Sequence, residues 1–164
     1  MAYVRRTPRD DEIEFPRRNA DERELYLSWL RYLRGAVLRN LDGVSDEGGH
    51  WTPDGALIPL LGVVNHLTHV EWRWIDGDMR GEEVSRSEDE FHPGAELTVA
   101  RAVAAYRARA DATDAYVRAA PSLEQIGRDA VDLRWVLLHL INETARHAGH
   151  ADATRELLDG TTGE

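Results

Sequence analysis

The stretch LLHLINETARHAGHAD, residues 137–152, lies within the longest helix that the sequence predicts, from about Asp132 to Leu158, with Gly160 after its end. In a helix, Glu143, His147 and His150 span only about 60° of the circumference, so their side chains share one face. A carboxylate and an imidazole four residues apart can bind one cation from adjacent turns. This face is therefore a candidate metal site.

Periodicity alone leaves the orientation of this helix open. Leu137, Ile141 and Ala145 form an apolar line on the opposite side. If that line faces the core, Glu143 and His147 form an ordinary exposed pair. If the Glu/His line faces inward, it can contribute two ligands to a buried metal site.

Three further helices are predicted before this one, and each carries an apolar stripe at helical spacing. The four helices run from near Asp21 to before Gly43, from about Ile58 to Ile75, from about Leu97 to Ala119 and from about Asp132 to Leu158. The segments Val44–Gly55 and Asp78–Gly94 are expected to be loops. Such stripes can be buried only against one another, so the predicted fold is all-α, a four-helix bundle over residues 21–160. Residues 1–20 are expected to form an N-terminal arm.

The second predicted helix offers a third ligand. Its apolar arc, which includes Gly62, Leu67 and Trp74, is centred close to His66, whereas His69 lies at the edge of the arc. One alternative is that His66 is simply a core histidine hydrogen-bonded to a neighbour. Two imidazoles and a carboxylate suit Zn(II), Ni(II) or Fe(II), and three ligands leave an open position, as in catalytic zinc sites. A fourth ligand such as His150 would favour a structural site.

Composition excludes several function classes. The 164 residues include no cysteine, so disulfides and a cysteine nucleophile are absent and any metal must use His, Asp or Glu. The net charge of −10 disfavours nucleic-acid binding. No apolar run approaches the roughly 18 residues that span a bilayer, so no membrane association is expected. Residues 1–20 show no hydrophobic leader region, and a cytoplasmic location is the expectation.

Residues 65–74 (NHLTHVEWRW) and 137–152 resemble the DinB-like superfamily, in particular the actinobacterial branch related to mycothiol-dependent maleylpyruvate isomerases and S-transferases. The resemblance implies an up-down-down-up four-helix bundle, often a homodimer, that holds a divalent metal. It implies His66, Glu143 and His147 as the ligands, with Glu143 standing where many members have a histidine. Zn(II) is the expected metal, with Ni(II) and Fe(II) as alternatives.

Two functions remain open. The first is a thiol-dependent, mycothiol-type S-transferase or isomerase that acts through a metal-bound thiolate, with a small-molecule thiol and an electrophile as its partners. The second is a non-enzymatic, metal-stabilised dimeric bundle that serves in binding or stress response. A pocket beside an incompletely coordinated ion would favour the first function, and full coordination by protein with no adjacent cavity would favour the second.

The sequence assigns no catalytic residue, although several side chains are candidates for lining a pocket. Trp51, Trp74 and Tyr106 could form its walls, or they could be core residues. The candidates for binding a substrate carboxylate are Arg73 and Arg146, which could equally form surface salt bridges. His139 is a candidate general base or a neighbour of the ligands. The acidic residues Glu82, Glu83, Glu88, Asp89 and Glu90 are expected to lie in a solvated loop, with a cover over the mouth of a pocket as the alternative.

Overall fold

The computed structural model of the protein describes residues 15–16, 21–53 and 56–163. These residues are mostly helical, which confirms the all-α prediction. The elements are α1 (Glu22–Arg39), α2 (Asp46–His50), α3 (Leu60–Trp72), the π-helical segment η1 (Arg73–Met79), the 3-10 helix η2 (Glu88–Phe91), α4 (Val99–Ala119) and α5 (Leu133–Asp159). The described residues contain no strand, only an isolated bridge between Ile126 and Asp132.

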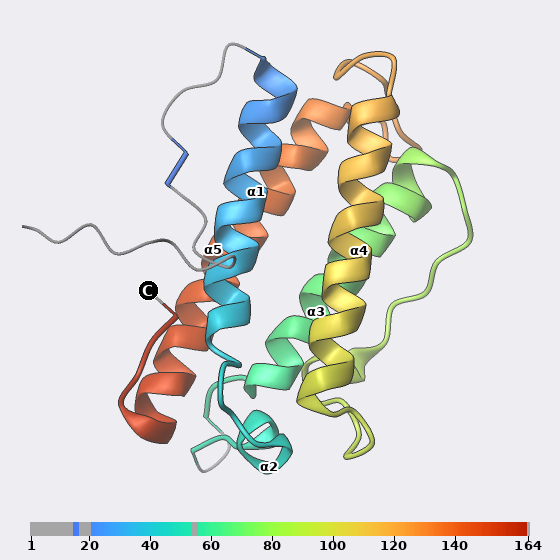
Figure 1. The fold of residues 1–164 in the computed structure, drawn as a ribbon. Coiled ribbons are helices and arrows are strands. Elements are labelled where there is room, and N and C mark those ends of the chain that lie inside the picture. The colour runs from blue at the N-terminus through green and yellow to red at the C-terminus, as the bar shows by residue number, and fades with distance from the viewer. Residues whose placement is uncertain (1–14, 17–20, 54–55, 164) are drawn as a thin grey trace, which may run out of the picture.

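The four long helices lie side by side (Figure 1). Helix α1 packs against α5, and α3 packs against both α4 and α5. Two apolar clusters fill the interior, one containing Leu30 and Leu137, the other containing Leu67 and Ala148. The contact between α3 and α5 matters most for function because it joins the two helices that carry the candidate ligands.

Capping residues set the ends of the predicted helices. The side chain of Asp21 accepts hydrogen bonds from the backbone N–H groups of Arg23 and Glu24, and Asp132 caps α5 in the same way. Gly160 ends α5 with a positive φ of 79°, a conformation that glycine adopts without strain. These boundaries agree with those predicted for the first and last helices.

Three predictions about where elements lie were wrong. The segment 78–94, predicted to be a loop, contains the 3-10 helix η2 and the last residues of η1. The segment Val44–Gly55 contains the short helix α2, which Ser45 caps through the backbone N–H of Gly48. The second predicted helix does not end before Gly77, since the chain continues through the π-helical turns of η1. Gly77 is buried in this segment, where a Cβ atom would lie 2.6 Å from the side chain of Val84. Its role is close packing rather than termination.

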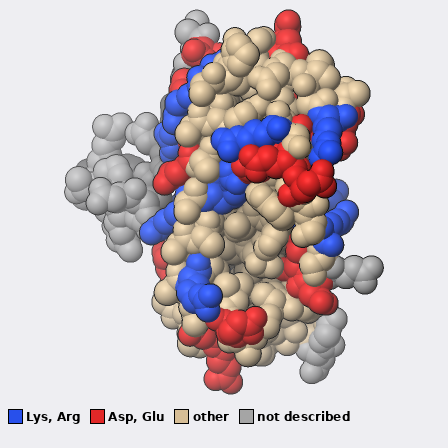
Figure 2. All heavy atoms as spheres, turned by 90° about the vertical axis from the view of Figure 1, so that its right-hand side faces the viewer, with Lys and Arg blue, Asp and Glu red and all other residues tan. Residues whose placement is uncertain are grey.

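The predicted arm, residues 1–20, lies outside the described residues except for Phe15 and Pro16. The ring of Phe15 meets those of Trp29 and Tyr32 edge-on, with centroids 4.9 and 5.3 Å apart. Among the described residues, none of the helices combines the length and the apolar character needed to cross a membrane. Figure 2 shows acidic and basic side chains interspersed over the face that it presents.

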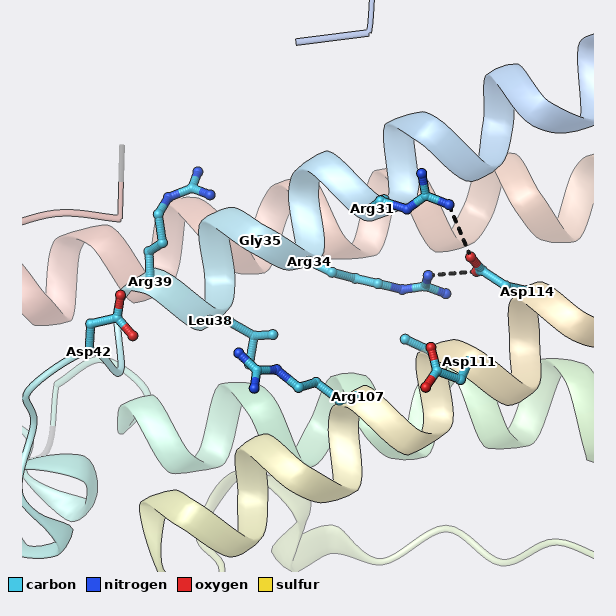
Figure 3. Close-up of a pocket in the computed structure, with 10 residues that line it drawn as sticks. Arg31, Arg34, Gly35, Leu38, Arg39, Asp42, Arg107, Asp111 and Asp114 are labelled. Atoms are coloured by element: carbon cyan, nitrogen blue, oxygen red, sulfur yellow. Dashed lines mark hydrogen bonds and ion pairs between the residues drawn. The ribbon is translucent and has the colours of Figure 1, made fainter. Parts of the chain in front are cut away.

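A buried ion pair links three of the helices. The guanidinium of Arg34 on α1 donates from Nε and Nη2 to the two carboxylate oxygens of Glu71 on α3, each at 2.8 Å. Its Nη1 donates to Asp114 on α4, also at 2.8 Å, as Figure 3 shows. The side chains of Arg34 and Glu71 are only 5% and 2% exposed. Removing either partner would leave the other charge buried and incompletely paired.

The substitution Glu71→Gln is therefore expected to lower the free energy of unfolding by roughly 3–5 kcal/mol, measured by urea denaturation. The matched control is Glu24→Gln, which breaks the half-exposed pair between Glu24 and Arg118 and should cost less than about 1 kcal/mol. Equal losses in the two variants would contradict a central role for the Arg34–Glu71 pair.

Candidate metal centre

The contact between α3 and α5 brings His66, Glu143 and His147 together. One ligand atom from each lies within 4.8 Å of those of the other two. The two histidines are 6% and 5% exposed, whereas Ala145 on the opposite side of α5 is exposed. Near His147 the Glu/His line of α5 therefore faces inward. Leu137, on the opposite line, is also fully buried, so both sides of this helix contribute to the interior.

The geometry of this group fits a metal ion. The Nε2 atoms of His66 and His147 lie 3.8 and 3.4 Å from the same oxygen, Oε2 of Glu143. Two ligand atoms on a tetrahedral ion with bond lengths of about 2.0 Å are roughly 3.3 Å apart, so only small shifts would close the group around one ion. Two imidazoles and a carboxylate are also a donor set that divalent transition metals use. The group could therefore hold a metal.

The remaining nitrogen of each imidazole has its own partner. Nδ1 of His66 lies 3.1 Å from Oε2 of Glu90, and Nδ1 of His147 lies 3.3 Å from Nδ1 of His150. His150 thus contacts the side of the His147 ring that faces away from the three-residue group. In both histidines, Nε2 is the atom turned towards Glu143.

Burial favours the neutral form of both imidazoles. Desolvation lowers the pKa of His66, although the hydrogen bond with Glu90 opposes this effect. Desolvation, and next the neighbouring His66, lower the pKa of His147 to about 4. A neutral imidazole retains the nitrogen lone pair that metal binding requires, so the site does not have to lose protons from its histidines near neutral pH.

Sequence reasoning missed Glu90, which was expected in a solvated acidic loop. The residue is only 4% exposed and forms an ion pair with Arg73 as well as contacting His66. Desolvation raises the pKa of its carboxyl group, but the hydrogen bond and charge of Arg73 outweigh this, and the pKa is lowered overall. No local pattern in the acidic run separates Glu90 from its exposed neighbours, because its burial depends on the contact between η2 and α3.

A cavity of about 440 Å³ adjoins the group and is lined by both His66 and Glu143. Trp74 forms part of its wall, as predicted, and His139, the candidate general base or neighbour of the ligands, also lines it. His139 stacks on Trp135 at 5.2 Å between ring centroids and also meets Trp74 at 4.9 Å. Arg73, Arg86 and Arg128 supply positive charge, and Asp78 and Asp129 supply negative charge.

The other expected pocket residues lie elsewhere. Tyr106 is fully buried in the apolar core, and Trp51 lines a separate hollow beside His50. Arg146 is 63% exposed, and its guanidinium is 3.9 Å from Glu143 at the surface. Tyr106 is thus a core residue, the alternative given for it from the sequence, and Trp51 lies away from the candidate centre.

A second cavity, of about 510 Å³, lies between α1 and α4 (Figure 3). None of the described residues that line it is a histidine. Arg31 and Arg34 reach across from α1 to Asp114, so these two positive charges are paired within the protein. The cavity beside His66 is therefore the one that could serve the candidate metal centre.

The fold and this site together define an all-α protein with a buried His–Glu–His group that could hold a metal ion. A family model described as Mycothiol-S-transferase matches residues 25–160, from the first turn of α1 to the glycine that ends α5. The chain belongs to this family, which confirms the resemblance to DinB-like proteins. Among curated proteins, no sequence matched the chain.

The helix η2, next to the site, packs closely against Gly62 of α3. A Cβ atom at Gly62 would lie 2.0 Å from the carbonyl oxygen of Phe91. Gly62→Ala is therefore expected to displace η2 and to lower the free energy of unfolding by roughly 1–3 kcal/mol. The control is Gly149→Ala on α5, where a Cβ atom meets nothing within 4 Å. It should stabilise the protein by up to about 1 kcal/mol through helix propensity. Thermal or urea unfolding would measure both, and a neutral Gly62→Ala would contradict the close packing.

Proposed function

We propose that this protein is a metal-dependent S-transferase that joins a small-molecule thiol of the mycothiol type to an electrophilic substrate. The observation that carries the proposal is the convergence of His66, Glu143 and His147 within 4.8 Å beside a cavity. Membership of the mycothiol-S-transferase family supports the choice of thiol.

His66 and His147 would bind the metal through Nε2, and Glu143 through a carboxylate oxygen. We infer Zn(II) as the metal, with Ni(II) and Fe(II) as alternatives that suit the same donors. Three protein ligands would leave a position open, which is the arrangement of catalytic rather than structural zinc sites. His150 is not included among the ligands because it contacts the opposite edge of the His147 ring.

The chain has no cysteine, so the reacting sulfur must come from a second molecule. When bound, the cation would lower the pKa of that thiol so that it reacts as a thiolate near neutral pH. The chain's own residues would enclose the reactants, since Trp74 and His139 form part of the cavity wall. Arg73 also lines the cavity, but its charge is paired with Glu90. The sulfur would then displace a leaving group, such as the chloride of a chloroalkyl electrophile: a sulfur–carbon bond forms, the carbon–chlorine bond breaks with loss of chloride, and the thiol proton passes to solvent.

The cavity argues against the alternative of a non-enzymatic metal-stabilised bundle. A structural site needs no space beside it, whereas about 440 Å³ adjoins His66 and Glu143 here. That volume lies within the range of small-molecule sites. Its mixed lining of arginines, aspartates and aromatic rings suits a polar thiol and a small co-substrate.

The proposal includes the wider architecture of the family. The long helices α1, α3, α4 and α5 would form an up-down-down-up four-helix bundle over residues 21–160, with residues 1–20 as an arm. The directions of the four ribbons in Figure 1 are compatible with this topology. The protein would act as a homodimer in the cytoplasm, where low-molecular-weight thiols are kept reduced.

Purified wild-type protein is expected to retain about one divalent metal ion per chain, measured by elemental analysis. His66→Ala and His147→Ala should each retain far less, because two ligands bind a divalent ion much more weakly than three. The matched control is His69→Ala, which removes another histidine of α3 whose ring contacts the backbone oxygen of Asn65. A metal-free wild type, or ligand variants that retain as much metal, would disprove the assignment.

Activity is expected to depend on the same ion. Conjugation of mycothiol to monochlorobimane, followed by fluorescence, should fall by about 100-fold or more after chelation and recover with one cation. His147→Ala should lose activity and His69→Ala should keep it. A metal-loaded wild type without conjugating activity would instead support the non-enzymatic bundle.

A further inference from the structure

We propose that Glu90 is a positioning residue for the candidate metal centre: its carboxylate holds the His66 ring so that Nε2 is presented to the ion. The inference rests on the proposed metal site and adds a residue from outside the two ligand helices.

The helix η2 is seated directly on α3. Gly62 allows the carbonyl of Phe91 to approach the α3 backbone, and the Asn65 side chain donates a 2.8 Å hydrogen bond to the carbonyl oxygen of Glu90. The Phe91 ring stacks on His66 with centroids 4.1 Å apart and an interplanar angle of 27°. These contacts fix the backbone that carries Glu90 and restrict rotation of the His66 ring.

The two ring nitrogens of His66 have different partners. Glu90 can only accept a hydrogen bond when ionised, so Nδ1, 3.1 Å away, must be the protonated nitrogen. Nε2 then carries the lone pair, and it faces Glu143 at 3.8 Å. A carboxylate behind a metal-binding histidine fixes the tautomer and the ring orientation in this way.

Arg73 completes the arrangement. Its guanidinium pairs with the second carboxylate oxygen of Glu90, so a negative charge that is almost fully buried is balanced. Glu90 therefore stays ionised while it accepts from His66. The Arg73–Glu90 pair carries no net charge. Glu90 can therefore accept the hydrogen bond from His66 without adding a net charge beside the metal site.

The test uses the full chain and the variants Glu90→Ala, Glu90→Gln and Asp89→Ala. Zn(II) affinity is measured by competition with a chelator, and the Co(II) form is examined by visible absorption. We expect Glu90→Ala to weaken Zn(II) binding by about 10- to 100-fold and to change the Co(II) spectrum. Glu90→Gln keeps an acceptor oxygen and should fall between Glu90→Ala and wild type. Asp89→Ala removes an exposed carboxylate from the same helix and should match wild type.

A second measurement needs no metal. Long-range proton–nitrogen NMR correlations of the metal-free protein should show His66 as the Nδ1–H tautomer in wild type and should show that preference lost in Glu90→Ala. An Nε2–H tautomer in wild type would overturn the inference even if Glu90→Ala failed to fold. So would a folded Glu90→Ala that binds Zn(II) as tightly as wild type with an unchanged Co(II) spectrum. A wild type that binds no Zn(II) would instead overturn this inference together with the metal site.

Discussion

The ion pair between Arg34 and Glu71 is the interaction on which the arrangement of the helices depends. Both charges are buried, and such a pair is tolerated only when its hydrogen bonds are satisfied. Glu71 takes two of the donors of Arg34, and Asp114 takes a third. The pair therefore restricts how α1, α3 and α4 can slide past one another. His66 lies on the same helix as Glu71, so the helix that carries this candidate ligand is one of the three that the pair joins.

The same requirement, that buried polar groups have partners, holds for the candidate centre at the contact between α3 and α5. An imidazole in a nearly dry interior needs a partner for each ring nitrogen. Glu90 and His150 meet the Nδ1 atoms of His66 and His147, and the Nε2 atoms converge on Glu143. A cavity of about 440 Å³ adjoins this group and is lined by His66 and Glu143.

Sequence reasoning succeeded where the evidence was local. The caps Asp21 and Asp132 bind backbone groups within a few residues, and the ends of α1 and α5 agree with prediction. It failed where a residue's role depends on a distant partner. Gly77 reads as a helix terminus, yet it serves to admit the side chain of Val84. Glu90 reads as a solvated acid, yet η2 buries it against α3.

By itself, the sequence determined that the chain is helical, which residues share a helix face and that Glu143 and His147 can act together, because these follow from the 3.6-residue period. Only the tertiary structure decided that this face of α5 points inward, that His66 meets it and that Glu90 stands behind His66. Each of these features is set by how one helix lies relative to another. They depend on packing and buried charge, which a periodic pattern along one helix does not specify.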